Sequence, residues 1–180
     1  CKSVDEGLEI ATQLEAMIDA DGDSIGLAAN QVGINKSVAV VKVGDRKPII
    51  LINPSIEKKE DEFTFVEGCL SMPGVNIFTR RYSTIEVRSA AYDEPLVLVG
   101  SDKSEKKELD EDGNPIVTEE QKQALLEAVC VQHEVDHLNG ILMTKRQIKR
   151  EPIVKQVKEF ARNEKVTIVN SETGEEKVIK

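Results

Sequence analysis

At 180 residues the chain has the size of one ordinary domain, long enough to bury a hydrophobic core without disulfides. Its net charge of −9 argues against a nucleic-acid or anionic-membrane partner, because both require a basic protein face. No apolar run approaches the roughly 18 residues that a membrane-spanning helix needs. Only three cysteines are present, so a disulfide framework is disfavoured and a reducing compartment is expected.

Helical and extended patterns follow one another along the first two thirds of the chain. Apolar residues recur at helical spacing over residues 5–20 and predict an amphipathic helix, which Asp21-Gly22-Asp23 ends. After a turn rich in glycine and alanine, β-branched runs predict strands at residues 37–43, 48–52, 84–89 and 95–99. The charged, turn-rich residues 100–115 are expected to form a surface loop or an extended hairpin, and a solvated loop is favoured over a flap that gates a cleft.

A second helix is predicted in the last third of the chain. Thr118-Glu119-Glu120-Gln121 has the form of a capping box, and the helix it begins should run to Leu138, with Asn139-Gly140 as its end. Residues 151–162 predict a short helix, and residues 166–180 a hairpin around Glu172-Thr173-Gly174. This order of elements predicts an α+β domain in which antiparallel β-sheets are partly wrapped around a central helix.

The predicted central helix carries the sequence His133-Glu134-Val135-Asp136-His137. Residues four apart lie on one helix face, so both imidazoles can reach one metal ion with Glu134 beside them. The alternative is a pair of ordinary helix histidines. We favour the metal site because the chain has two histidines in all and both lie in this pentapeptide. A catalytic metal usually has three protein ligands, and the third could be a downstream acidic residue or a cysteine.

Cys69 is the candidate cysteine. It lies in Glu67-Gly68-Cys69-Leu70-Ser71, a turn-like segment between predicted strands. Taken alone, a cysteine is more often a small core residue than a ligand. Cys130 fits that interpretation, because it lies three residues before His133 on the same predicted helix, and we expect it in the packed core.

Three motifs resemble those of the peptide deformylase family, in the family's order. Residues 24–31 are similar to the first, G-x-G-x-A-A-x-Q, with Ser24 in place of the first glycine. If this position required a positive φ, Ser24 would strain the loop. Residues 67–71 match the second motif and residues 132–137 the third. The resemblance implies a deformylase-like catalytic domain over residues 1–145, with residues 146–180 as a helix-and-hairpin tail of the same domain or an appendage.

The resemblance implies a metallo-amidohydrolase that removes the N-formyl group from formyl-methionine at the N-terminus of nascent peptides and releases formate. Ferrous iron is the expected metal, with Zn²⁺, Ni²⁺ or Co²⁺ as substitutes. Glu134 would take a proton from the attacking water and deliver one to the leaving amine. The side-chain amide of Gln31 and the backbone N–H of Leu70 would donate to the oxyanion. The implied metal ligands are Cys69, His133 and His137.

The resemblance also implies positions that bind the substrate or support the metal. Backbone groups of Ile25, Gly26 and Gly68 would hold an extended peptide as an added strand. Glu67 and Arg81 would form a supporting ion pair near the metal. The methionine side chain would occupy an apolar pocket, although core packing explains its apolar residues almost as well; this pocket would be formed by Ile25, Phe65, Leu126, Val129 and His133.

Two alternative functions remain open. A zinc metallopeptidase could use the same H-E-x-x-H with Glu151 or Glu159 as third ligand, and would keep its metal without Cys69. A non-catalytic homologue could bind peptide N-termini, although Glu134 and Gln31 are both present. We expect a monomer in the cytoplasm or another reducing compartment, such as an organelle or an infected host cytosol. Its expected partners are formylated nascent peptides, with the ribosome as a candidate place of action, and no membrane or nucleic acid.

Overall fold

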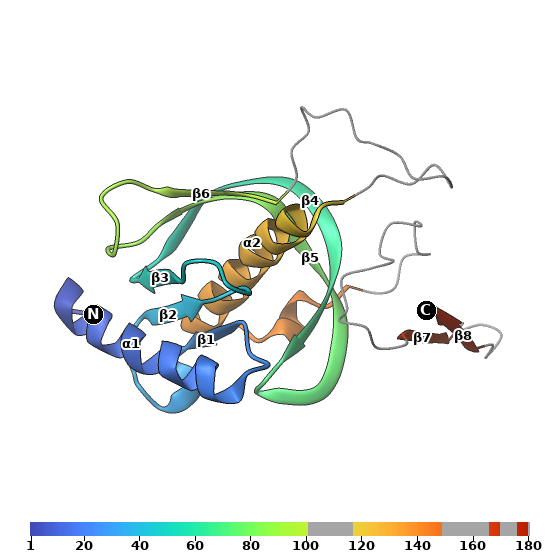
Figure 1. Cartoon of the computed structure of the whole chain (residues 1–180), viewed down its shortest axis with the longest axis horizontal. Helices are drawn as coiled ribbons and strands as arrows, with labels where there is room; N and C mark the ends of the chain where they lie inside the picture. Colours follow the sequence, from blue (N-terminus) through green and yellow to red (C-terminus); the bar gives the residue numbers. More distant parts are fainter. Residues whose placement is uncertain (101–116, 149–165, 170–175, 180) are drawn as a thin grey trace. The chain divides into compact units, whose positions relative to one another are not determined.

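A computed structural model describes residues 1–100, 117–148, 166–169 and 176–179, the last two ranges as strands only (Figure 1). The loop expected at residues 100–115, apart from Gly100, and the helix expected at 151–162 lie outside the described residues. The chain divides into two units, Cys1–Ile148 and Lys149–Lys180. Within the described part, no helix is long and apolar enough to cross a membrane.

Helix α1 (Val4–Asp21) confirms the predicted N-terminal helix. The Ser3 side chain accepts a hydrogen bond from the Glu6 N–H at the helix start, and Gly22 ends the helix with a φ of 73°. The apolar face of α1, which includes Leu14 and Ile18, is buried against the first sheet. Ser24 follows without a positive φ, and its N–H donates to Asp21 Oδ2, so the strain considered for a serine at this position does not arise.

The first sheet has the antiparallel order β1-β2-β3, with β1 (Gly26–Ala28), β2 (Val38–Val41) and β3 (Ile49–Ile52). Strand β2 is buried along its whole length because α1 covers one face and helix α2 (Glu119–Leu138) covers the other. Its side chains alternate accordingly: Val38 and Val40 join the core on the α1 side, and Ala39 and Val41 the core on the α2 side. Strands β2 and β3 confirm the predictions for residues 37–43 and 48–52.

The second sheet has the antiparallel order β4-β5-β6, with β4 (Ser55–Cys69), β5 (Met72–Arg88) and β6 (Leu96–Val99). Strands β4 and β5 form a long curved hairpin that passes around α2 (Figure 1). Strand β6 and the last part of β5 were predicted, whereas β4 was not. The prediction of a turn at residues 67–71 was partly wrong, because Glu67, Gly68 and Cys69 end β4 and only Leu70 and Ser71 form the turn.

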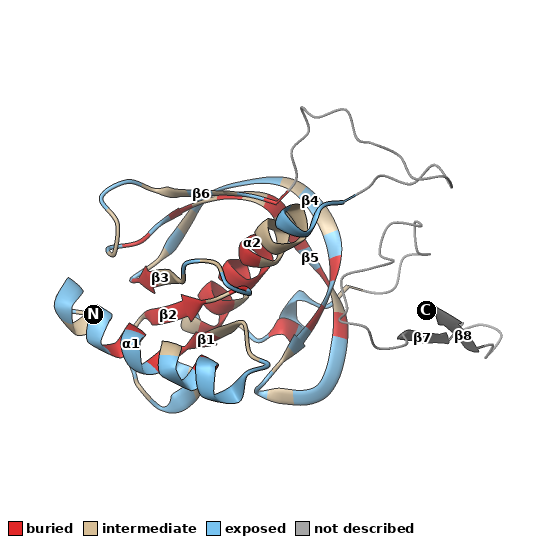
Figure 2. Cartoon of the chain, in the orientation of Figure 1, coloured by how far each residue is buried: buried red, intermediate tan, exposed pale blue. Residues whose placement is uncertain are grey.

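Helix α2 (Glu119–Leu138) lies at the centre of the first unit and is buried through its middle (Figure 2). The capping box between Thr118 and Gln121 is present, and the helix ends at Asn139, followed by Gly140 with a φ of 69°. Cys130 lies in the core as predicted. Two short 3-10 helices complete the described part of this unit, η1 (Ala29–Val32) after β1 and η2 (Met143–Arg146) after α2. The two antiparallel sheets around α2 confirm the predicted α+β fold. In the second unit, β7 (Val166–Val169) and β8 (Glu176–Ile179) pair antiparallel, as the hairpin prediction requires.

Candidate metal centre

Three potential metal ligands converge where the end of β4 meets α2. Cys69 Sγ lies 3.2 Å from His137 Nε2, and His137 Nε2 lies 3.0 Å from His133 Nε2. All three ligand atoms lie within 4.8 Å of one another. A thiolate and two imidazoles are a donor set that zinc, iron, nickel and cobalt all accept, so these residues fit one divalent cation.

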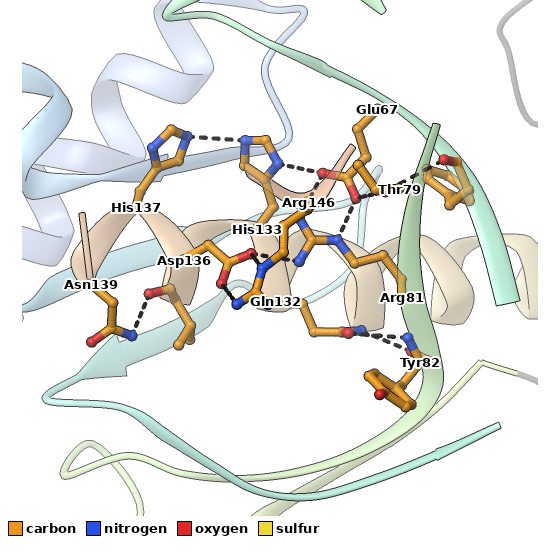
Figure 3. Close-up of polar contacts among 12 residues, drawn as sticks. Glu67, Thr79, Arg81, Tyr82, Gln132, His133, Asp136, His137, Asn139 and Arg146 are labelled. Carbon is orange, nitrogen blue, oxygen red and sulfur yellow. Dashed lines mark hydrogen bonds and ion pairs between the residues drawn. The ribbon is translucent and has the colours of Figure 1, made fainter. Parts of the chain in front are cut away.

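The orientation of His133 is set by Glu67. Glu67 Oε2 lies 2.7 Å from His133 Nδ1, so Nδ1 donates to this carboxylate and leaves Nε2 on the side of Cys69 and His137 (Figure 3). Burial would raise the pKa of Glu67, but hydrogen bonds from Arg81 and His133 outweigh it and lower this pKa to about 2. Thr79 also donates its hydroxyl to Glu67 Oε1 at 2.5 Å. Glu67 therefore stays charged behind the imidazole.

A chain of alternating charges continues from Glu67 away from the ligands (Figure 3). Arg81 Nη2 donates to Glu67 Oε2 at 2.8 Å, and Arg81 Nη1 donates to Asp136 Oδ2 at 2.7 Å. Arg146, in η2, donates from Nη2 to Asp136 Oδ1 at 2.7 Å. The ion pair between Glu67 and Arg81 was predicted, but Asp136 and Arg146 were missed. Asp136 occupies a variable position of H-E-x-x-H, and no sequence signal marks Arg146 ten residues later.

Further hydrogen bonds hold α2 against its neighbours. Gln132 accepts from the Tyr82 N–H at 3.1 Å and donates to the Tyr82 carbonyl at 2.8 Å, which ties α2 to β5 beside Arg81 (Figure 3). Asn30, in η1, donates to the His137 carbonyl at 2.6 Å. The two histidines are therefore fixed through the backbone of their helix as well as through their own side chains.

Cys69 lies in surroundings that favour the thiolate. Burial would raise the pKa of its thiol, but hydrogen bonds from His133, His137 and the Ser71 N–H outweigh burial and lower this pKa to about 5. The thiolate is the form that binds metals.

Glu134 is buried beside the ligands with one oxygen unpaired. Its Oε1 lies 4.0 Å from Cys130 Sγ, whereas none of the described residues hydrogen-bonds to Oε2. Burial raises the pKa of Glu134 to about 7, although the nearby His133 and His137 act in the opposite direction. A carboxyl group that titrates near neutrality and has a free oxygen can accept and return a proton.

The remaining predicted residues surround this centre. Gln31 Oε1 accepts from the Ala28 N–H at 2.8 Å, and Gln31 Nε2 lies 4.0 Å from Cys69 Sγ. Leu70 directly follows Cys69 in the exposed turn. A Cβ at Gly26 would lie 2.7 Å from Glu134 Oε1, so only glycine allows β1 to approach this carboxylate so closely.

The apolar residues predicted for the methionine pocket are distributed over several elements. Phe65 on β4 and Val129 on α2 are buried, and Ile25 and Leu126 are half-buried against the core that contains Cys130. Gly68 is exposed on β4. These contacts are those of ordinary packing, and the pocket stays a prediction.

A thiolate, two imidazoles and an unpaired buried carboxylate, held on an α+β scaffold, define the class of metal-dependent hydrolases. The family model described as polypeptide deformylase matches residues 1–99 and 101–152. The peptide deformylase of Alkalilimnicola ehrlichii is 39% identical over 166 residues, covering 89% of this chain and 79% of the relative. That of Saccharophagus degradans is 38% identical, covering 86% of this chain and 81% of the relative.

Solved structures agree with these relatives. A probable peptide deformylase from Synechococcus phage S-SSM7 has a TM-score of 0.59 at 32% identity, covering 80% of this chain and 85% of that one. The peptide deformylase from Thermotoga maritima has a TM-score of 0.58 at 29% identity, covering 83% and 86%. The chain belongs to the peptide deformylase family, and its reaction is the removal of the N-formyl group from nascent peptides. The resemblance and the predicted activity are thus confirmed, and the metallopeptidase alternative is wrong.

Proposed function

We propose that this chain performs deformylation with a metal ion held by Cys69, His133 and His137, and with Glu134 as general base. The observation that carries the proposal is the convergence of the three ligand atoms within 4.8 Å beside the unpaired Glu134 Oε2. The bound ion would supply Lewis acidity, which lowers the pKa of a water and polarises the formyl oxygen. We propose ferrous iron as the native ion, since a thiolate–imidazole set accepts it, with zinc, nickel and cobalt as substitutes.

Glu134 moves the protons. Its Oε2 accepts a proton from the attacking water and then returns one to the amine that leaves as formate is released. Burial, which raises the pKa of Glu134 to about 7, makes both transfers accessible near neutral pH.

Gln31 and Leu70 stabilise the charge that develops on the formyl oxygen. The Gln31 Nε2–H and the Leu70 N–H are both neutral donors, so their state does not change over the pH range in which Glu134 titrates. Support comes from their positions, because Leu70 follows Cys69 in the chain and Gln31 Nε2 lies 4.0 Å from Cys69 Sγ.

The substrate enters as an extended peptide. Strand β1 is the edge of its sheet in the order β1-β2-β3, so the backbone of Gly26 can pair with an added strand, and exposed Gly68 can contact its other side. The predicted pairing through the Ile25 carbonyl is not open in the same way, because this carbonyl accepts the Lys42 N–H at 2.8 Å. Apolar side chains would receive the methionine, namely those of Ile25, Phe65, Leu126 and Val129, together with the His133 ring. The partners would be formylated nascent peptides, met at the ribosome, and the enzyme would act as a monomer in a reducing compartment such as the cytoplasm.

The test is formate release from formyl-Met-Ala-Ser by protein purified anaerobically with ferrous iron or nickel. Wild type should release formate, and Glu134→Gln should bind metal but lose activity. Cys69→Ala should lose both metal and activity. Glu120→Gln, an exposed position on the same helix, is the matched control and should behave as wild type.

Two results would contradict the proposal. Activity retained by metal-loaded Glu134→Gln would remove this residue from proton transfer. A metal-loaded wild type that releases no formate would favour a homologue that only binds peptides.

A further inference from the structure

The side-chain amide of Gln31 is held at both ends. The Ala28 N–H can only donate, so the Gln31 atom 2.8 Å from it must be the oxygen Oε1. The nitrogen Nε2 therefore faces the other way and lies 3.1 Å from Ser71 Oγ, to which it donates. Because the amide group is planar and its terminal torsion is otherwise broad, these two contacts together decide which way its N–H groups point.

Ser71 is placed by the tight turn at the end of the β4–β5 hairpin. Cys69 pairs with Met72, so Leu70 and Ser71 are the two residues of the turn. The Ser71 N–H hydrogen-bonds to Cys69, while the Ser71 hydroxyl receives the hydrogen bond from Gln31. One residue outside the proposed machinery thus contacts both a proposed metal ligand and a proposed oxyanion donor.

The Gln31 Nε2 nitrogen carries two hydrogens, and its contacts show where each of them points. One is donated to Ser71 Oγ at 3.1 Å, and the other is directed toward the side of Cys69 Sγ, 4.0 Å away. At this distance the second N–H makes no strong bond within the chain, so it is available to an oxygen bound near the ligand cluster.

We propose that Ser71 is a positioning residue for deformylation: its hydroxyl engages one N–H of Gln31 and so directs the other at the formyl oxygen. This inference rests on the proposed function, because it requires Gln31 to be an oxyanion donor. Without the hydroxyl, the amide keeps its Ala28 contact but can swing about it. The donor is then present yet aimed at the oxyanion for only part of the time.

Loss of the Ser71 hydroxyl should lower kcat and leave KM nearly unchanged. Loss of an oxyanion donor itself lowers kcat by about 10²–10³, so loss of its orientation alone should cost less, about tenfold. KM should change less than about twofold, because the contact is made in the transition state and not in the ground state. Bound metal should be unchanged, since the substitution Ser71→Ala keeps the backbone N–H that faces Cys69.

The experiment measures kcat, KM and metal content for Ser71→Ala, Ser71→Thr, Gln31→Leu and the double variant. Ser71→Ala should lower kcat about tenfold, and Ser71→Thr, which keeps the hydroxyl, should restore it. In the Gln31→Leu background, Ser71→Ala should have no further effect, because its only route to the reaction is removed. Ser55→Ala, at an exposed serine that begins β4, is the control for loss of a surface hydroxyl.

A second readout does not depend on turnover. In the zinc-loaded, ¹⁵N-labelled protein, one of the two side-chain amide proton signals of Gln31 should be shifted downfield of its free-amide position in wild type and Ser71→Thr. In Ser71→Ala the downfield-shifted, hydrogen-bonded signal should move toward the position of a free amide.

The outcomes separate this inference from the proposed function. If Gln31→Leu lowers kcat but Ser71→Ala does not, or if the two effects simply add, the positioning role of Ser71 is overturned while the oxyanion role of Gln31 stands. If Gln31→Leu keeps full kcat, the oxyanion assignment fails and the inference about Ser71 fails with it.

Discussion

Glu67 and His133 are joined by a hydrogen bond of 2.7 Å between Oε2 and Nδ1, although they lie 66 residues apart in the chain. The bond is on the side of the imidazole that faces away from Cys69 and His137. A buried carboxylate on β4 therefore determines which nitrogen of a helix residue is free to bind metal.

Replacing Glu67 by glutamine should weaken metal binding. Glu67→Gln keeps the shape of the side chain but removes the charge that holds the proton on His133 Nδ1, so metal affinity should fall about tenfold to a hundredfold. Competition between the protein and a chromophoric chelator for cobalt measures this change. Glu62→Gln, on the exposed part of the same strand, is the matched control. Equal affinities for Glu67→Gln and wild type would contradict the role given to this carboxylate.

The metal-free protein should lose stability in acid through Glu67. Its pKa is about 2 in the folded protein against an ordinary value of 4.5, so the folded state is stabilised above 4.5 and loses this contribution as pH falls toward 2. The contribution at neutral pH is on the order of 3 kcal/mol. Urea unfolding measured down this pH range should show a steeper loss for wild type than for Glu67→Gln, which cannot titrate at this position. Identical slopes would show that the carboxylate is not the group responsible.

The two outer members of the charge chain should differ in what they contribute. Asp136→Asn leaves buried Arg81 without one of its two partners and should cost about 3–5 kcal/mol of unfolding free energy. Arg146→Met should cost about 1 kcal/mol at most, because the Arg146 side chain is 41% exposed. Chemical denaturation measures the loss of unfolding free energy in both variants, and the loss should be larger for Asp136→Asn. Arg88→Met, which breaks the exposed pair with Glu57, is the control. Equal losses for Asp136→Asn and Arg146→Met would mean that burial does not govern this network.

A methyl group at position 26 should displace the general base. The Cβ of Gly26→Ala would overlap Cys130 Sγ and would lie 2.7 Å from Glu134 Oε1, so both side chains must move. A shift of about 1 Å in Glu134 should lower kcat on the order of a hundredfold while metal remains bound. Steady-state kinetics with metal analysis measures both quantities.

The double variant Gly26→Ala/Cys130→Ala identifies the cause. It removes the sulfur contact but leaves the contact with Glu134, so kcat should stay low. Full recovery of kcat in this variant would assign the defect to Cys130 instead.

Sequence patterns predicted the two long helices and the pair of candidate histidine ligands because their signals are local, whereas Cys69 was indicated only by the resemblance of residues 67–71 to the family's second motif. A capping box, helical spacing and two histidines four residues apart are all visible within one segment of α2. The first half of β4 carries no such signal, since residues 57–62 are all charged and mostly exposed. Its pairing depends on partners across the hairpin, such as the ion pair between Lys58 and Glu86.

The supporting residues were unpredictable for a similar reason. Asp136 and Arg146 acquire their roles only because η2 returns to the flank of α2. Ser71 acquires its contact with Gln31 only because the turn after β4 lies beside η1. Each of these contacts forms between segments that the fold brings together, so the residues next to Asp136, Arg146 and Ser71 in the sequence do not indicate it.

After η2 the chain contacts β5, and these contacts determine where a shortened protein can end. Ile148 donates its N–H to the Phe78 carbonyl at 2.9 Å, and Gln147 forms an isolated bridge with Thr79. A version cut after Lys145, the boundary expected from the motifs, would lack these contacts and also Arg146, one of the two cations that pair with Asp136. A truncated enzyme for crystallisation or NMR should therefore retain every residue through Ile148.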